Sequence, residues 1–183
     1  MTDHNASRDD NDSQVPHFRT ATEVDWQRIW PVFHAVVASG DTYMFDPFIG
    51  EADAKAAWLF VGLARQRTYV AELDGEFVGT AILRPSQPGQ GDHVANAAWM
   101  IHPGAAGRGI GRRFATHVLS EACELGFEAM QFNAVVASND RAVQLWNSIG
   151  FDVVGRVPAA FRTIQGGRED VLIMHMALNQ HRE

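Results

Sequence analysis

Three glycines at alternating positions, Gly107, Gly109 and Gly111, form the most informative pattern in the sequence. They lie in IHPGAAGRGIGRRF (101–114), after an apolar segment that predicts a strand and before a periodic segment that predicts a helix. Glycine lets another group approach the backbone closely, and the free amides of a helix N-terminus attract anions. The spacing therefore predicts an anion site that suits a phosphate.

Arginines surround these glycines, because Arg108, Arg112 and Arg113 fall in the same segment. The lysine that a P-loop requires after its glycines is missing, and the G-x-G-x-G spacing differs from the G-x-G-x-x-G of a dinucleotide fold. The turn also follows several predicted strands, whereas the dinucleotide motif follows the first one. A glycine-rich turn that serves only chain reversal is the alternative interpretation.

Hydrophobic periodicity predicts the elements that must position this turn. Pro31 falls within the first predicted helix and is expected to kink or shorten it. The pattern predicts strands at 17–20, 68–73, 76–83, 93–101, 129–137, 151–157 and 170–178, and helices at 26–37, 52–65, 110–125 and 139–149. This order predicts an α/β (α+β) fold with a mixed sheet and helices packed on it. A long loop is expected at 161–170.

Composition bounds the functional class. The 183 residues carry a formal net charge of −7, which excludes a typical basic nucleic-acid binder and disfavours anionic membrane surfaces. No apolar run is long enough to predict a transmembrane helix, and the N-terminus has no apolar signal segment. Cys123 is the only cysteine, which excludes an intrachain disulfide and fits a cytoplasmic protein.

The first sixteen residues differ from the rest of the chain. MTDHNASRDDNDSQVP is nearly all polar, so 1–16 is predicted to be a disordered tail. No linker divides the remainder, and 17–183 is therefore expected to be a single domain.

A second motif, NDRAVQLWNSIGF (139–151), accompanies the glycine turn. Together the two segments resemble the GCN5-related N-acetyltransferase (GNAT) family. The first family motif falls on 106–111, and the second falls on Asn139, Ala142, Leu145, Trp146, Gly150 and Phe151. The resemblance implies the GNAT fold, a mostly antiparallel seven-stranded sheet with helices on both faces and splayed central strands.

The resemblance also implies acetyl-coenzyme A as co-substrate and no metal. The turn amides would hold the pyrophosphate, the preceding strand would pair with the pantetheine arm, and Asn139 would contact that arm. The residues implied for the cofactor are Trp99, Met100, Ile101, Ala106, Gly107, Arg108, Gly109, Ile110, Gly111, Arg112, Asn139 and Trp146.

Two positions depart from the family pattern. Ala106 replaces the usual Gln or Arg of the first motif. Trp146 stands where many relatives carry the tyrosine that protonates the leaving thiolate, and an indole cannot serve as a general acid near neutral pH. Core packing and contact with the thioester are both open, compatible roles for Trp146.

A narrower resemblance points to the acceptor. The segments at 30–47, 94–103 and 130–151 are similar to the proline-analogue (azetidine-2-carboxylate) N-acetyltransferases, which detoxify small cyclic imino acids. That resemblance places Asn96 and Asn133 in the acceptor and catalytic site. Carboxamides donate and accept hydrogen bonds without charge, so they suit an amino-acid carboxylate, a nucleophilic nitrogen or a developing oxyanion. The alternative is that each satisfies backbone groups at a bulge.

The loop TYMFDPF (42–48) borders the acceptor pocket in this family, which nominates Thr42, Tyr43 and Phe45. The strand at 93–101 carries no Glu, so the general base stays open among His93, Glu72, Asp41 and His175. In the loop expected at 161–170, Arg162 and Arg168 either meet an acceptor carboxylate or remain solvated.

The sequence predicts an acetyltransferase in which a small-molecule amine attacks the thioester directly. A protein or peptide N-acetyltransferase is the first alternative, and a non-catalytic acyl-CoA-binding sensor module is the second. Members of the family are often dimers, which leaves a homodimer open.

Overall fold

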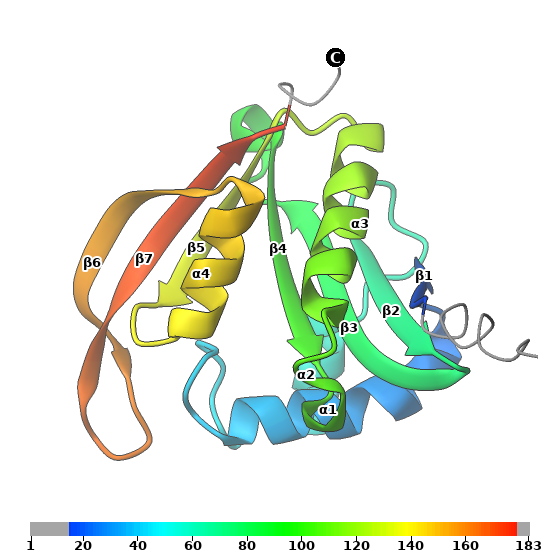
Figure 1. Ribbon diagram of the computed structural model, residues 1–183, viewed down its shortest axis with the longest axis horizontal. Coiled ribbons are helices and arrows are strands. Elements are labelled where there is room, and N and C mark those ends of the chain that lie inside the picture. The colour runs from blue at the N-terminus through cyan, green and yellow to red at the C-terminus, as the bar shows by residue number, and fades with distance from the viewer. Residues whose placement is uncertain (1–14, 179–183) are drawn as a thin grey trace, which may run out of the picture.

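The structure, a computed structural model, describes residues 15–178, which form a sheet with helices packed on it (Figure 1). The strands are β1 (His17–Thr20), β2 (Arg67–Leu73), β3 (Glu76–Pro85), β4 (Val94–Ile101), β5 (Ala129–Val136), β6 (Asp152–Arg162) and β7 (Arg168–Ala177). The helices are α1 (Trp26–Ala38), α2 (Glu51–Trp58), α3 (Ile110–Glu124) and α4 (Asp140–Ile149), with short 3₁₀ turns at Glu23–Asp25, Gly89–Gly91 and Pro103–Ala105. Apart from Val15 and Pro16, the predicted tail lies outside the described residues.

The described strands form one sheet in the order β1-β2-β3-β4-β5-β7-β6. Its neighbours are antiparallel except β4 and β5, which pair in parallel. The predicted mixed, mostly antiparallel seven-stranded sheet is confirmed. None of the helices in the described part of the chain is long and apolar enough to cross a membrane.

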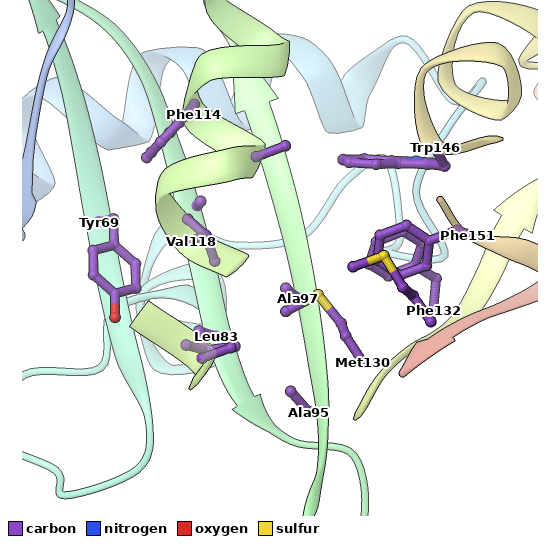
Figure 2. Close-up of a cluster of buried hydrophobic side chains, with 14 of the residues drawn as sticks. Tyr69, Leu83, Ala95, Ala97, Phe114, Val118, Met130, Phe132, Trp146 and Phe151 are labelled. Carbon is purple, nitrogen blue, oxygen red and sulfur yellow. The ribbon is translucent and has the colours of Figure 1, made fainter. Parts of the chain in front are cut away.

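Helices cover both faces of the sheet because its strands are apolar on both sides. On β4, Ala95 and Ala97 pack in the core beneath α3 and α4, whereas Met100 packs on the opposite face with α1 and α2. Figure 2 shows the first of these cores, in which Phe114 and Val118 of α3 lie over the strands. The central strand β4 is therefore held from both sides.

Three sequence predictions about elements need correction. The second helix ends at Trp58 because the chain turns extended at Leu59. The amide of Phe60 then donates to the Thr68 side-chain hydroxyl at 2.8 Å, and the Phe60 carbonyl accepts from the Thr68 amide at 3.2 Å. Pro31 does not end the first helix, which continues to Ala38 with the proline on its exposed side.

The last two strands are longer than predicted, and the loop expected at 161–170 shrinks to the turn at 163–167. Bulges in β6 let its pairing with β7 continue to the register pair Arg162–Arg168. Those two arginines therefore occupy strand ends, and both are exposed.

Candidate active site

β4 and β5 separate soon after they meet. Only Val94–Ala129 and Ala95–Met130 form register pairs between the described residues of the two strands. The side chain of Asn96 then adds one more link, donating from Nδ2 to the backbone carbonyl of Gln131 at 2.9 Å. Past this point β4 continues to Ile101 with one edge facing a gap.

The backbone groups that face the gap follow from the hydrogen bonds on the other side of β4. The amide of His102 donates to the carbonyl of Val78 in the β3 direction at 2.9 Å. Because backbone groups alternate sides along a strand, those of Ala97, Trp99 and Ile101 point toward the gap. The splay expected between the central strands thus exposes a short row of amides and carbonyls.

A cleft of about 1010 Å³ occupies this gap and is lined from both faces of the sheet. Residues from the α1–α2 side include Val36 and Met100, and residues from the α3–α4 side include Trp99 and Leu145. The predicted site residues that line it are Thr42, Tyr43, Trp99, Met100, Ile101, Ala106, Gly107, Gly109, Ile110, Gly111, Arg112, Asn139 and Trp146. The cleft therefore lies in the gap between β4 and β5 and is bounded by residues from both faces of the sheet.

The glycine turn opens one end of the cleft. Gly107 and Gly109 have φ of +85° and +73°, a conformation that favours glycine, and a Cβ at either would meet nothing within 4 Å. Gly109 is the N-cap of α3 and supplies no side-chain cap, which leaves the first amides of the helix available. These features fit the pyrophosphate of acetyl-CoA, which the turn amides and the helix dipole would hold.

The α4 side of the cleft carries the second motif. Asn139 caps α4, its Oδ1 accepting from the amide of Ala142 at 3.2 Å. The Trp146 ring lies 4.8 Å from the Trp99 ring and 4.7 Å from the Phe132 ring, centroid to centroid. Figure 2 shows Trp146 beside Phe132. Trp146 is thus part of the core and also a wall of the cleft. The buried Nε1 of Trp99 has no hydrogen-bond partner among the described residues.

The charged side chains on the cleft wall are basic. Arg112 donates to the carbonyl and the hydroxyl of Ser148, bridging α3 and α4, and Arg141 stands at the start of α4. No acidic residue of the described chain lines the cleft. Arg108 is exposed and lies outside the cleft lining. The positive charge near the glycine turn suits a phosphate-bearing ligand.

The two strand asparagines do not line the cleft. They share a polar cluster at the closed end of the splay, in which Gln131 is the central member. Besides its link to Asn96, Gln131 donates from Nε2 to Asn133 Oδ1 at 2.7 Å, and Asn133 Nδ2 donates to Ser86 at 3.4 Å. The part played by Gln131 was missed from the sequence, although strand alternation already placed it on the same face as Asn133.

The four candidate general bases lie in different parts of the structure. Glu72 is bound by Arg19 and Arg28 at 3.0 and 2.7 Å, and its hydrogen bond with Arg19 lowers the pKa of the carboxyl. It lies on β2 outside the cleft lining, which removes it as a base. His175 pairs in register with Gln131 and is half-buried, whereas His93 and Asp41 are exposed. His175 is the candidate that adjoins the polar cluster.

Some residues of the loop after α1 line the cleft, and others pack in the core. Thr42 and Tyr43 line the cleft, and the Tyr43 hydroxyl donates to the backbone carbonyl of Trp99. Phe45 points elsewhere, because its ring packs 5.2 Å from that of Phe33 in the α1–α2 core. The Tyr43 contact could not be read from the sequence, since it joins residues 56 positions apart.

Comparison with known proteins shows the family. The sequence profile described as "Acetyltransferase (GNAT) family" matches residues 30–151. The chain belongs to the GNAT family. Its fold resembles that of a GCN5-related N-acetyltransferase from Kribbella flavida, with a TM-score of 0.84 and 39% identity over 88% of this chain and 97% of that one.

Three further proteins share lower identity with this chain. The chain is 32% identical over 85 residues to N-acetyltransferase aca1 of Schizosaccharomyces pombe, covering 46% of this chain and 41% of aca1, well under two thirds of that protein's length. It is 27% identical over 135 residues to L-amino acid N-acyltransferase MnaT of Escherichia coli, covering 73% of this chain and 77% of MnaT. The yncA acetyltransferase of Salmonella typhimurium, solved with its cofactor acetyl-CoA, shares the fold with a TM-score of 0.81, 21% identity, and coverage of 92% and 97%.

Proposed function

We propose that this GNAT chain is an acetyl-CoA-dependent N-acetyltransferase whose acceptor is a small amino or imino acid. The observation that carries the proposal is the cleft between β4 and β5, with an anion-binding turn at one end and uncharged carboxamides beside the other. The similarity to MnaT, named as an L-amino acid N-acyltransferase, supports an acceptor of this class.

Different residues of the chain would bind the cofactor and close the cleft around it. The turn at 106–112 and the gap-facing amides of Trp99 and Ile101 would hold acetyl-CoA, which supplies an activated thioester carbonyl when bound. Trp146 and Phe132 close the α3–α4 side and exclude water from that region. Holding both reactants in one narrow cleft supplies much of the rate through proximity.

Transfer by direct attack suits this arrangement better than an acyl-enzyme. Cys123 lies on α3 and packs against the α3–α4 core instead of lining the cleft. The hydroxyl of Ser148 on the cleft wall is engaged by Arg112. The acceptor nitrogen would therefore attack the thioester itself. Asn133, whose chain neighbours Phe132 and Ala134 line the cleft, would orient the acceptor, whereas Asn96 satisfies the backbone carbonyl of Gln131.

A protein acceptor is the main rival, and the charges of the cleft favour a small acceptor over it. An open acidic groove would bind a cationic peptide terminus, but no described acidic side chain lines this cleft. The carboxamides of Gln131 and Asn133 suit a zwitterionic acceptor, because each amide can donate to a carboxylate or accept from an amine. Within the small acceptors, the similarity of 30–47 and 130–151 to the proline-analogue enzymes favours a cyclic imino acid such as azetidine-2-carboxylate.

The test is thiol release from acetyl-CoA with a panel of acceptors. The panel contains azetidine-2-carboxylate, 4-hydroxyproline, linear amino acids, phosphinothricin and a short peptide. We expect turnover with the amino or imino acids. In Asn133→Ala we expect kcat/KM to fall by at least about tenfold, because the acceptor loses a hydrogen bond and one of its polar groups is left unpaired. Turnover with the peptide alone would refute the proposal. Binding of acetyl-CoA without turnover of any acceptor would indicate a non-catalytic acyl-CoA sensor.

A further inference from the structure

The carbonyl of Trp99 lies where β4 has lost its neighbour. It faces the gap between β4 and β5, past the last register pair at Ala95. A strand carbonyl in a sheet normally accepts from the adjoining strand, and an unpaired one away from water is costly. This carbonyl instead accepts from the Tyr43 hydroxyl, which comes from the loop after α1.

Tyr43 is held rigidly enough to serve as that substitute partner. Its ring packs 6.0 Å from Trp58 in an edge-on arrangement and 6.3 Å from Phe45. Burial raises the pKa of the hydroxyl above its ordinary value near 10, so it remains a donor throughout the neutral range. Trp58 is itself fixed by a 3.0 Å hydrogen bond from its Nε1 to Thr80 on β3. The loop is therefore connected to the sheet twice, through the Tyr43 hydroxyl to β4 and through the Tyr43 ring and Trp58 to β3.

We infer that Tyr43 is a positioning residue, whose hydroxyl holds the free edge of β4 in the strand conformation that the arm of acetyl-CoA requires. The inference rests on the proposed use of acetyl-CoA. The contact also joins the two halves of the cleft, because Tyr43 belongs to the acceptor-side loop and Trp99 to the strand that would bind the cofactor. Loss of the hydroxyl would let the gap-facing amides of β4 fluctuate, which weakens cofactor binding and misaligns the thioester.

The experiment compares Tyr43→Phe with Tyr69→Phe, which changes the other tyrosine of the chain. The Tyr69 hydroxyl also donates a part-buried hydrogen bond, to Glu121 at 3.0 Å, but Tyr69 lies outside the cleft lining. Each variant keeps its aromatic ring and loses one hydroxyl, so both are expected to fold with similar small losses of stability. Measurements are the melting temperature, the Kd for acetyl-CoA by calorimetry, hydrogen exchange of the amides at 97–101 without ligand, and kcat and KM on the acceptor that the wild type uses.

We expect Tyr43→Phe to weaken acetyl-CoA binding by about fivefold, the effect of one hydrogen bond, and to speed exchange at 97–101. We expect the fold-decrease in kcat to be larger than the fold-increase in KM for the acceptor. Tyr69→Phe should leave the Kd, the exchange at 97–101 and kcat unchanged. Equal Kd and equal exchange in Tyr43→Phe and the wild type would overturn the inference while leaving the proposed function intact. A wild type that does not bind acetyl-CoA would overturn both.

Discussion

Two glycines with the same backbone conformation allow the cofactor end of the cleft to be tested by a matched pair of substitutions. Gly109 in the turn and Gly62 in the loop after α2 both have φ of +73°, and a Cβ at either meets nothing within 4 Å. Gly109 lines the cleft and Gly62 does not. Alanine at each position therefore imposes the same backbone strain, and only Gly109→Ala places a methyl group where the phosphates are expected.

The expected loss of stability is small and equal in the two variants. The left-handed conformation costs an L-residue about 1–2 kcal/mol. Replacing glycine also restricts the unfolded chain, which returns about 0.4–1 kcal/mol. The net destabilisation is thus about 1 kcal/mol for Gly109→Ala and for Gly62→Ala, too little to unfold an ordinary domain.

Cofactor affinity should separate the two variants. We expect Gly109→Ala to weaken acetyl-CoA binding by at least about tenfold, or about 1.4 kcal/mol, because the methyl group keeps a phosphate from the turn amides. Gly62→Ala should bind as the wild type does. Urea denaturation measures the stabilities and calorimetry measures the Kd. Unchanged affinity in Gly109→Ala, or an equal loss in Gly62→Ala, would show that the turn does not hold the cofactor.

Three further predictions concern stability and binding. The buried Asp25 accepts two hydrogen bonds from Arg19, at 2.8 and 2.9 Å, which lower the pKa of its carboxyl. Since a lowered pKa stabilises the fold above the unfolded pKa, Asp25→Asn should cost about 2 kcal/mol at pH 7, by denaturation, and the difference from wild type should shrink below about pH 4. Trp58→Phe should cost about 2 kcal/mol by the same assay, because Trp58 is fully buried and bonded to Thr80. Acetyl-CoA should quench tryptophan fluorescence, and Trp146→Phe, which removes an indole from the cleft wall, should reduce the change.

The sequence by itself determined the order of elements and the glycine turn. Both are local properties, since periodicity sets which face of a helix or strand is apolar and glycine adopts the positive φ of Gly107 and Gly109 at the least cost. The cap of α4 by Asn139 is equally local, because the Oδ1 acceptor and the Ala142 amide are three positions apart. These features could be predicted without knowing how the sheet assembles.

Only the tertiary structure decided how the site is completed. The bond between Tyr43 and Trp99, and the chain from Asn96 through Gln131 to Asn133, depend on strand register and on the separation of β4 from β5. The alternating pattern of a strand tells which of its faces is buried, but it does not tell which strand is its neighbour or where two neighbours separate. The second helix and the last hairpin were misjudged because backbone pairing overrode local preference. Phe60 bonds to Thr68, eight positions away, and bulges let β6 pair with β7 to its end.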